Sequence, residues 1–584
     1  MLALVALLLA LVGAALAPAE RPMAIKGDEA TYVAMALSVA YDQDLRYTPI
    51  DLHRFKEMFG TGPVGIFLQR TRPPASQGLA FGKSFAYPVV AAPFVRAGGL
   101  RGLLFLNLLL LEAIVWMAWM FASARMRAGP AFALAVAFVC ASILGLYAVW
   151  RTPEVLNTTL VFGGYFLWLY KYVAHEEAAA RNRWLVHPAT DYVAAALLGL
   201  ATFSKPNNAL LIVPVVASIL ARERVRRVIL VGLAFLLFSA GAFGVNWLVS
   251  GELNYQGGDR RTFSEHFPYS DRTKSFDQGW PMVTENTDAQ TLLAPSTFWP
   301  VFAHNTLYFF AGRDAGLLPY FFPGVVILIA WLARPRAWTR WQGLIVLALG
   351  ASVVVMQAYA PDTWNGGGGP LGNRYFLALY PAMFFLLPAA ASRWTAVAAV
   401  LGFAVTAPLL AHPLAASLEP WHNVEHGIPR LLPIELTLAD NLPVRLDLNR
   451  SRLELDGALL YEMDENAFLP EETKRFWVAG AARAEMILRT DRSIAKATLR
   501  LHSAVANHVV VRLGRARAAI DLAADADGTV VLEPGPGAAY NGGSRAYVFT
   551  VTTTNGFVPM EVDPKSHDRR FLGVFIEPHF VLNP

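Results

Sequence analysis

Two adjacent carboxylic acids follow the first apolar segment of the chain. Residues 1–19 are apolar apart from the amino terminus, and Asp28 and Glu29 come shortly afterwards. Carboxylates at a membrane surface are energetically expensive, which favours a functional role, and a carboxylate can accept a proton from an attacking hydroxyl group. The alternative is structural, because Asp28 could cap the helix that follows it, with Glu29 in the favourable first turn.

Two cationic side chains could complement these acids, since cations stabilise a phosphate group as it leaves. Lys83 precedes a short apolar stretch that ends near Val95. Arg374 follows the glycine run at 366–369 and can present two parallel donors to phosphate oxygens. The structural alternatives are an interfacial lysine whose amino group reaches water and an interfacial arginine after a loop.

Further charged and polar residues lie at predicted helix ends on the same side of the membrane as Asp28. They are Arg151, Glu154, Lys205, Asn373 and Tyr375. Charge at this side is not needed to orient the protein, so it indicates a functional site. Ordinary turn chemistry at an interface is the alternative for the charged members of the set.

The composition is that of a polytopic membrane protein. Hydrophobic residues make up 55% of the 584 residues and charged residues 16%, which is too apolar for a soluble globule of this length. The single cysteine, Cys140, excludes an internal disulfide and a cysteine-based metal cluster. The net charge of +5 comes from arginines between apolar segments, so we expect no nucleic-acid partner.

Apolar segments of roughly spanning length predict about eleven transmembrane helices within residues 1–411. The segments are 1–19, 102–121, 131–149, 156–174, 190–204, 207–221, 228–249, 316–333, 342–360, 375–391 and 394–411. We expect the first to be a retained anchor, because no Lys or Arg precedes its apolar run, although Ala15-Leu16-Ala17 is similar to a signal-peptide cleavage site.

The Arg-rich connections between these segments, such as 222–227 and 334–340, set the expected orientation. The positive-inside rule assigns them to the cytoplasm. The first loop, 20–101, then faces outward, together with the loop at 250–315 and everything beyond residue 411. The sequence therefore predicts a multi-pass protein of the cell membrane (a bacterial inner or plasma membrane), with its site on the outer face.

The composition changes at His412, where hydrophobic runs shorten and polar residues alternate with them. We expect residues 412–584 to form a separate β-rich extracytoplasmic domain. Short strands separated by Gly, Pro, Asn and Asp turns predict a β-sandwich. The expected strands are 497–502, 509–513, 529–532, 547–551 and 571–576.

Several of these motifs resemble those of the GT-C glycosyltransferases. The Gly-Asp-Glu at 27–29, followed by a Tyr-containing helix and an Asp-x-Asp-Leu turn at 42–45, resembles their first external loop, most of all in the protein mannosyltransferases and lipid A aminoarabinose transferases. The Asn-Arg-Tyr at 373–375 is similar to the start of a late helix in that family. Lys83 takes the place of a family lysine, although the Pro-Pro that usually follows is absent. The end of the chain, 568–574, looks like the last strand of jelly-roll domains on some cell-envelope glycosyltransferases.

The resemblance implies a GT-C-like membrane domain over 1–411 that transfers a sugar from a polyprenyl-phosphate donor. The acceptor would be a glycan, lipid or protein of the cell envelope, and the anomeric carbon would be inverted. Asp28, with Glu29 beside it, would act as the base or position the acceptor, while Lys83 and Arg374 would hold the donor phosphate. The residues expected to line the site are Arg151, Glu154, Lys205, Asn373 and Tyr375.

No cofactor is certain, and a divalent metal stays possible. Asp42 and Asp44 form an Asp-x-Asp, a pair that often holds a metal through nucleotide phosphates in soluble glycosyltransferases. A turn with solvated acids is the preferred interpretation here. His53, His266 and His304 lack the spacing of zinc ligands.

Two other classes of function stay open. A transporter or flippase of lipid-linked sugars would also need many spans and buried charge. Against it, the segments show no evident inverted repeat, and their charges gather at outer helix ends. A non-catalytic envelope assembly protein would use the membrane part as a scaffold, and it would tolerate Asp28→Asn.

Overall fold

The structure, a computed structural model, describes residues 27–222, 225–270, 276–282, 295–442, 452–455, 457–468, 474–540 and 543–584. The predicted anchor at 1–19 lies outside the described residues. The chain divides into two compact units, each made of stretches that are separated in the sequence. The first unit comprises Met1–Glu285, Leu318–Val355 and Arg374–Leu418, and the second comprises Asn286–Leu317, Met356–Asn373 and Glu419–Pro584.

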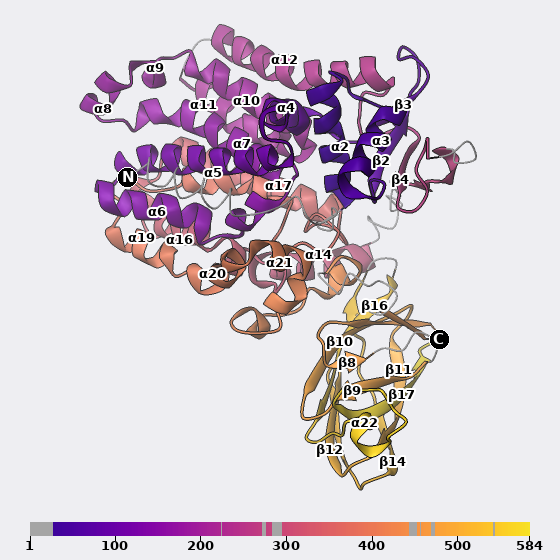
Figure 1. The fold of residues 1–584 in the computed structure, drawn as a ribbon. Coiled ribbons are helices and arrows are strands. Elements are labelled where there is room, and N and C mark those ends of the chain that lie inside the picture. Colours follow the sequence, from indigo (N-terminus) through magenta and orange to yellow (C-terminus); the bar gives the residue numbers. More distant parts are fainter. Residues whose placement is uncertain are drawn as a thin grey trace. The chain divides into compact units, whose positions relative to one another are not determined.

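The first unit is mostly helical (Figure 1). Its principal helices are α2 (Gly27–Tyr41), α3 (Pro49–Phe59), α4 (Ala86–Gly98), α5 (Leu100–Ser123), α6 (Ala128–Cys140), η2 (Ile143–Val149), α7 (Glu154–Leu169), α10 (Thr190–Ser204), η4 (Pro206–Ile212), α11 (Val213–Leu220), α12 (Val225–Ser250), α16 (Phe322–Leu332), α19 (Arg393–Val400) and α20 (Phe403–Ala411). Shorter helices are α8 (Glu176–Arg181), α9 (Arg183–Val186), η7 (Phe376–Ala378), α18 (Tyr380–Phe384) and α21 (Pro413–Leu418). Two further helices, α15 (Leu317–Tyr320) and α17 (Arg340–Tyr359), each contain a boundary between the units.

Among the described residues, α5, α12 and α17 are long and apolar enough to cross a membrane. Two bent pairs, α6 with η2 and α19 with α20, raise the number of candidate spans to five. Other predicted segments are shorter or broken; residues 375–391, for example, contain η7 and α18 in place of one continuous helix. A mostly helical region with membrane-length helices is therefore confirmed.

The helix that carries the two acids differs from its expected form. The sequence predicts that α2 is weakly amphipathic and lies along the membrane plane, with residues such as Tyr32 on one face. Instead α2 is buried on every side from Glu29 to Leu37. It packs against α4, where the rings of Tyr32 and Tyr87 meet edge to edge at 6.3 Å. Small alanines between its large residues allow this close packing, so α2 is a core helix of the first unit.

A five-stranded antiparallel sheet joins the first loop to the loop after α12. Its order is β1-β3-β2-β4-β5. The strands are β1 (Arg46–Tyr47), β2 (Ile66–Arg70), β3 (Leu79–Phe81), β4 (Arg260–Phe263) and β5 (Trp280–Pro281). Because β2 pairs with β4, two loops that are distant in the sequence form one layer.

The second unit contains α14 (Pro295–Ala311) and the antiparallel β-sheets of the C-terminal region. One sheet has the order β13-β12-β16-β10-β7-β6, with β15 beside β16, and the other has the order β14-β11-β17-β9-β8. The strands are β6 (Arg452–Leu455), β7 (Ala458–Glu462), β8 (Ala467–Phe468), β9 (Phe476–Ala479), β10 (Arg483–Thr490), β11 (Ile494–Ser503), β12 (Asn507–Leu513), β13 (Ala516–Leu522), β14 (Ala526–Leu532), β15 (Ala538–Ala539), β16 (Arg545–Thr553) and β17 (Leu572–Leu582).

The two sheets of the second unit share one apolar core. Met486 and Phe549 from the first sheet pack with Leu499 and Ile576 from the second. Alternate residues of β11 and β12 are buried, as expected for strands with one face on a core. The strands predicted near 497–502, 509–513, 529–532, 547–551 and 571–576 are confirmed as parts of β11, β12, β14, β16 and β17.

Candidate functional site

A buried chain of ion pairs links five separate segments of the first unit. The Oδ1 of Asp28 lies 2.7 Å from the Nζ of Lys83, and its Oδ2 accepts a hydrogen bond from Arg374. Arg374 donates through Nε to the Oε1 of Glu154 at 2.6 Å, and the Nζ of Lys205 reaches the same oxygen at 3.1 Å. Five of the residues predicted from the sequence therefore meet in one network, which we call the ion network.

Helix ends hold three of the five members of the ion network, whereas Lys83 and Arg374 lie in the segments before α4 and η7. Asp28 lies in the first turn of α2, and Glu154 is the first residue of α7. Lys205 is the C-cap of α10. These positions suit the helix dipole, which favours acids at the first turn and cations after the last. The side chains keep at most about an eighth of their surface exposed, so solvent screens their interactions weakly.

Glu29 and Arg151 lie next to the ion network and join α2 to the turn before α7. The Oε1 of Glu29 accepts a hydrogen bond of 2.8 Å from the backbone N–H of Arg151. Both side chains are buried. Glu29 thus fixes the position of the turn that carries Glu154, which makes it a positioning residue in this geometry.

The carboxyl groups of the site differ sharply in their protonation. Burial alone would raise the pKa of Asp28, but Lys83 and Arg374 outweigh it and hold that pKa well below its usual range. Glu154 shows the same balance, because Lys205 and Arg374 overcome its burial and bring its pKa to about 2. Burial raises the pKa of Glu29 to about 7, despite the opposing charge of Arg151. Asp28 and Glu154 are therefore ionised at neutral pH, whereas Glu29 is close to half protonated.

One cation of the site, Arg260 on β4, is not among the residues predicted from the sequence. The side chain is 7% exposed, and its charge interacts with that of Asp28. Among the described residues Arg260 forms no ion pair, and its Nε has no hydrogen-bond partner. The sequence did contain a signal for it, because Arg260 and Arg261 lie in a loop expected to face outward, where the positive-inside rule disfavours arginine.

The remaining predicted residues have mixed positions. Tyr375 lies close enough to Asp28 and Glu154 for their charges to act on its hydroxyl group. Asn373 is buried and belongs to the second compact unit. The glycine run at 366–369 also belongs to that unit, where Gly368 N–H donates to the Oδ1 of Asn441 at 3.3 Å. All four of these glycines have positive φ values, which explains the need for glycine there.

The side chains of the site are poorly suited to hold a metal ion. No group of three His, Cys, Asp or Glu side chains with suitable geometry occurs in the described part of the chain. The carboxylates of Asp28 and Glu154 are already engaged by cations. Asp42 pairs with Arg54 at 2.7 Å, and the Oδ1 of Asp44 accepts a hydrogen bond from Ser38, so the Asp-x-Asp serves the local fold.

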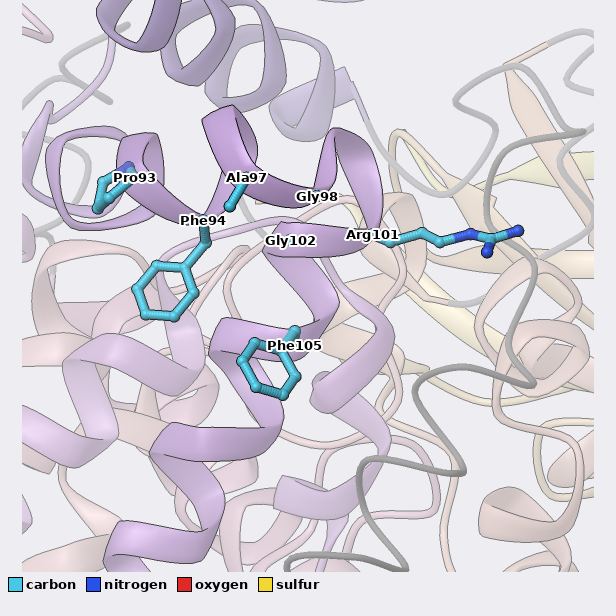
Figure 2. Close-up of a pocket in the computed structure, with 7 residues that line it drawn as sticks. All are labelled: Pro93, Phe94, Ala97, Gly98, Arg101, Gly102 and Phe105. Atoms are coloured by element: carbon cyan, nitrogen blue, oxygen red, sulfur yellow. The ribbon is translucent and has the colours of Figure 1, made fainter.

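A separate pocket of about 490 Å³ lies where α4 meets α5 (Figure 2). Its lining residues are Pro93, Phe94, Ala97, Gly98, Arg101, Gly102 and Phe105. The pocket is apolar, and Figure 2 shows the side chain of Arg101 extending away from the two phenylalanine rings. Because Arg101 is the one charged residue among those that line it, and no carboxylate, histidine or nucleophile joins it there, this pocket is not a candidate for catalysis.

Comparison with known proteins gives no evidence of function, so the function is inferred from the geometry of the site. No protein-family model matches the chain, and no curated protein matches it.

Proposed function

We propose that this chain is an integral membrane glycosyltransferase of the GT-C type. It moves a sugar from a polyprenyl-phosphate donor to a cell-envelope acceptor on the outer face of the membrane. The observation that carries the proposal is the ion network, in which Asp28 is shared by Lys83 and Arg374. An acid that can take a proton and cations that can hold a phosphate thus lie within one hydrogen-bond length of each other.

The charge of the site supports an anionic ligand. Cationic side chains outnumber the carboxylates around Asp28, since Lys83, Lys205, Arg374 and Arg260 face Asp28 and Glu154. Buried charge without compensation is unfavourable, and phosphate oxygens would supply the missing negative charge. Arginine and lysine donors form strong, short hydrogen bonds with phosphate.

The proposed reaction is a single displacement. The acceptor hydroxyl oxygen attacks the anomeric carbon while the bond from that carbon to the phosphate oxygen breaks. The electron pair of the broken bond leaves on polyprenyl phosphate, whose charge Lys83 and Arg374 stabilise. Asp28 takes the proton of the acceptor hydroxyl group. Attack from the face opposite the leaving group inverts the anomeric carbon.

Donor binding would also activate the base. While Lys83 and Arg374 pair with Asp28, the carboxylate is a weak proton acceptor because its pKa is held low. A phosphate that takes over these two cations removes that stabilisation, so the pKa of Asp28 rises towards its ordinary value. The proton acceptor would therefore become competent only when the donor is in place.

The membrane placement belongs to the same proposal. About eleven spans, with the first loop and residues 412–584 outside the cytoplasm, would put the ion network at the outer surface. The C-terminal region would be a jelly-roll-like β-sandwich that binds acceptor glycan or shapes the site. Polyprenyl-phosphate donors are membrane lipids, which suits a site at helix ends.

Sugar transfer by membranes that contain Lys83→Gln tests the proposal. A mixture of labelled polyprenyl-phosphate sugars is the donor pool, and Lys56→Gln, an exposed change on α3 in the same loop, is the control. We expect transfer by the wild type and the control, and a loss of about a hundredfold with Lys83→Gln, as for other electrostatic groups that stabilise a leaving charge. Equal transfer by Lys83→Gln at matched expression would contradict the role of Lys83.

A further inference from the structure

Two cations of the site lie over one aromatic ring. The Nζ of Lys83 is 4.3 Å from the centre of the Phe67 ring, and the Cζ of Arg260 is 4.9 Å from it. Both side chains are positively charged and repel each other, so Arg260 disfavours the charged form of Lys83. A ring whose face carries negative charge attracts both cations and offsets this repulsion.

The register of the five-stranded sheet explains this arrangement. Gln69 on β2 lies directly opposite Arg260 on β4. Side chains alternate along a strand, so Phe67, two residues before Gln69, shares a face of the sheet with Arg260. On the other side of β2, the backbone N–H of Gly82 donates to the carbonyl oxygen of Phe67, which places Lys83 next to the ring.

Gly82 gives Arg260 the space to reach the ring. A Cβ atom at residue 82 would lie 3.1 Å from Cδ and 3.3 Å from Nε of Arg260. Such contacts are tighter than ordinary packing, so a larger residue would displace the guanidinium group. Gly82 therefore leaves room for Arg260, and the next residue, Lys83, supplies the second cation.

We propose that Phe67 is a positioning residue that holds Lys83 and Arg260 side by side, so that the two cations form a binding site for the donor phosphate. The inference rests on the proposed function. The side chain of Phe67 need not contact the phosphate, because its effect is exerted through the two cations. Arg260 adds a donor that no carboxylate of the described residues engages in an ion pair.

A second phenylalanine also lies beneath two arginines of the same sheet, but those arginines are neutralised by carboxylates. Phe276 lies beneath Arg70 at 4.9 Å and Arg261 at 5.3 Å. Both arginines form ion pairs with Asp277 and Asp259. Phe276 thus holds a neutralised pair of cations, which makes Phe276→Leu a control for the loss of an aromatic ring beneath two cations.

The test measures binding of a long-chain polyprenyl phosphate to the purified full chain in detergent. We expect Phe67→Leu to bind this probe about tenfold more weakly, which is the loss of two cation–π contacts. Phe67→Tyr should restore binding, and Phe276→Leu should leave it unchanged. In transfer assays, Phe67→Leu should raise the KM for donor and change kcat little.

Two further variants make the outcome decisive. Gly82→Ala, which displaces Arg260 without altering Phe67, should weaken binding in the same direction. Phe67→Leu in an Arg260→Gln background should cost less than in the wild type, since one of its two contacts is already lost. Wild-type affinity in both Phe67→Leu and Gly82→Ala, alongside a clear loss in Arg374→Gln, would overturn the role of Phe67 and leave the proposed function standing. Equal binding by the wild type and Arg374→Gln would overturn the proposed function and this inference with it.

Discussion

Asp28 and Lys83 form a buried ion pair, with 2.7 Å between Oδ1 and Nζ. The ammonium group that neutralises Asp28 is also the group that the proposal assigns to the donor phosphate. Under that proposal, carboxylate and phosphate would compete for the same cation, and Arg374, which also pairs with Asp28, would be shared in the same way. This competition gives Asp28→Asn an effect on affinity that is opposite to its effect on transfer.

We expect Asp28→Asn to bind polyprenyl phosphate about tenfold more tightly than the wild type, because an amide competes poorly for Lys83 and Arg374. Titration of the purified chain with this lipid measures the change. Weaker binding by the variant would mean that Asp28 supports the phosphate site rather than competing for it.

Glu154 should be the most costly member of the ion network to neutralise. Its side chain is 1% exposed, and one of its oxygens forms ion pairs with both Arg374 and Lys205. Glu154→Gln leaves the buried Lys205 without a carboxylate and Arg374 with Asp28 alone, so we expect the free energy of unfolding to fall by about 3 kcal/mol. Denaturation of the detergent-solubilised chain measures this loss, and an unchanged midpoint would contradict the account.

Glu29 should make stability depend on pH near neutrality. Burial raises its pKa from 4.5 to about 7, so its stabilising contribution is fully present below pH 4.5 and is lost as the pH rises through 7. The loss is about 3 kcal/mol by this linkage. Glu29→Gln keeps an acceptor for the Arg151 N–H and cannot ionise, so it should remove that dependence.

The measurement compares the denaturation midpoints of the wild type and Glu29→Gln from pH 5 to pH 8. Burial also raises the pKa of Asp51 and Asp464 to about 6, so only the difference between the two proteins isolates Glu29. A constant difference across this range would show that Glu29 does not titrate there. The lowered pKa values of Asp28 and Glu154 act in the opposite sense, and their contribution is lost only in acid.

Much of the candidate site was predictable from the sequence because charge is rare in this chain. Asp28, Lys83, Glu154, Lys205 and Arg374 stand near the ends of apolar segments, where charge is not needed to orient the protein, although each also had a structural interpretation. The positions of helix ends and the positive-inside rule together place such residues on one face. Strand pairing is less visible, so the contribution of Arg260 followed only from the pairing of β2 with β4.

The fold was predictable in outline and less so in detail. Runs of apolar residues predict helices, and the short alternating runs beyond residue 411 predict strands, as β11 and β12 show. The predicted span at 375–391 is instead broken, with Pro381 at the start of α18. Hydropathy does not distinguish a helix buried against lipid from one buried against protein. For this reason α2 was expected at the membrane surface, although it lies in the core of the first unit.

Sugar transfer by Asp28→Asn, compared with transfer by Asp191→Asn, directly tests the role of Asp28 as the proton acceptor. Asp191 is also a first-turn carboxylate between a lysine and an arginine, with Lys171 at 2.5 Å and Arg227 at 2.6 Å. Removing either carboxylate therefore imposes a similar structural cost. Membranes with matched amounts of each folded variant would receive labelled polyprenyl-phosphate sugars. We expect Asp28→Asn to abolish transfer and Asp191→Asn to retain it, and undiminished transfer by Asp28→Asn would contradict the role of Asp28 as proton acceptor.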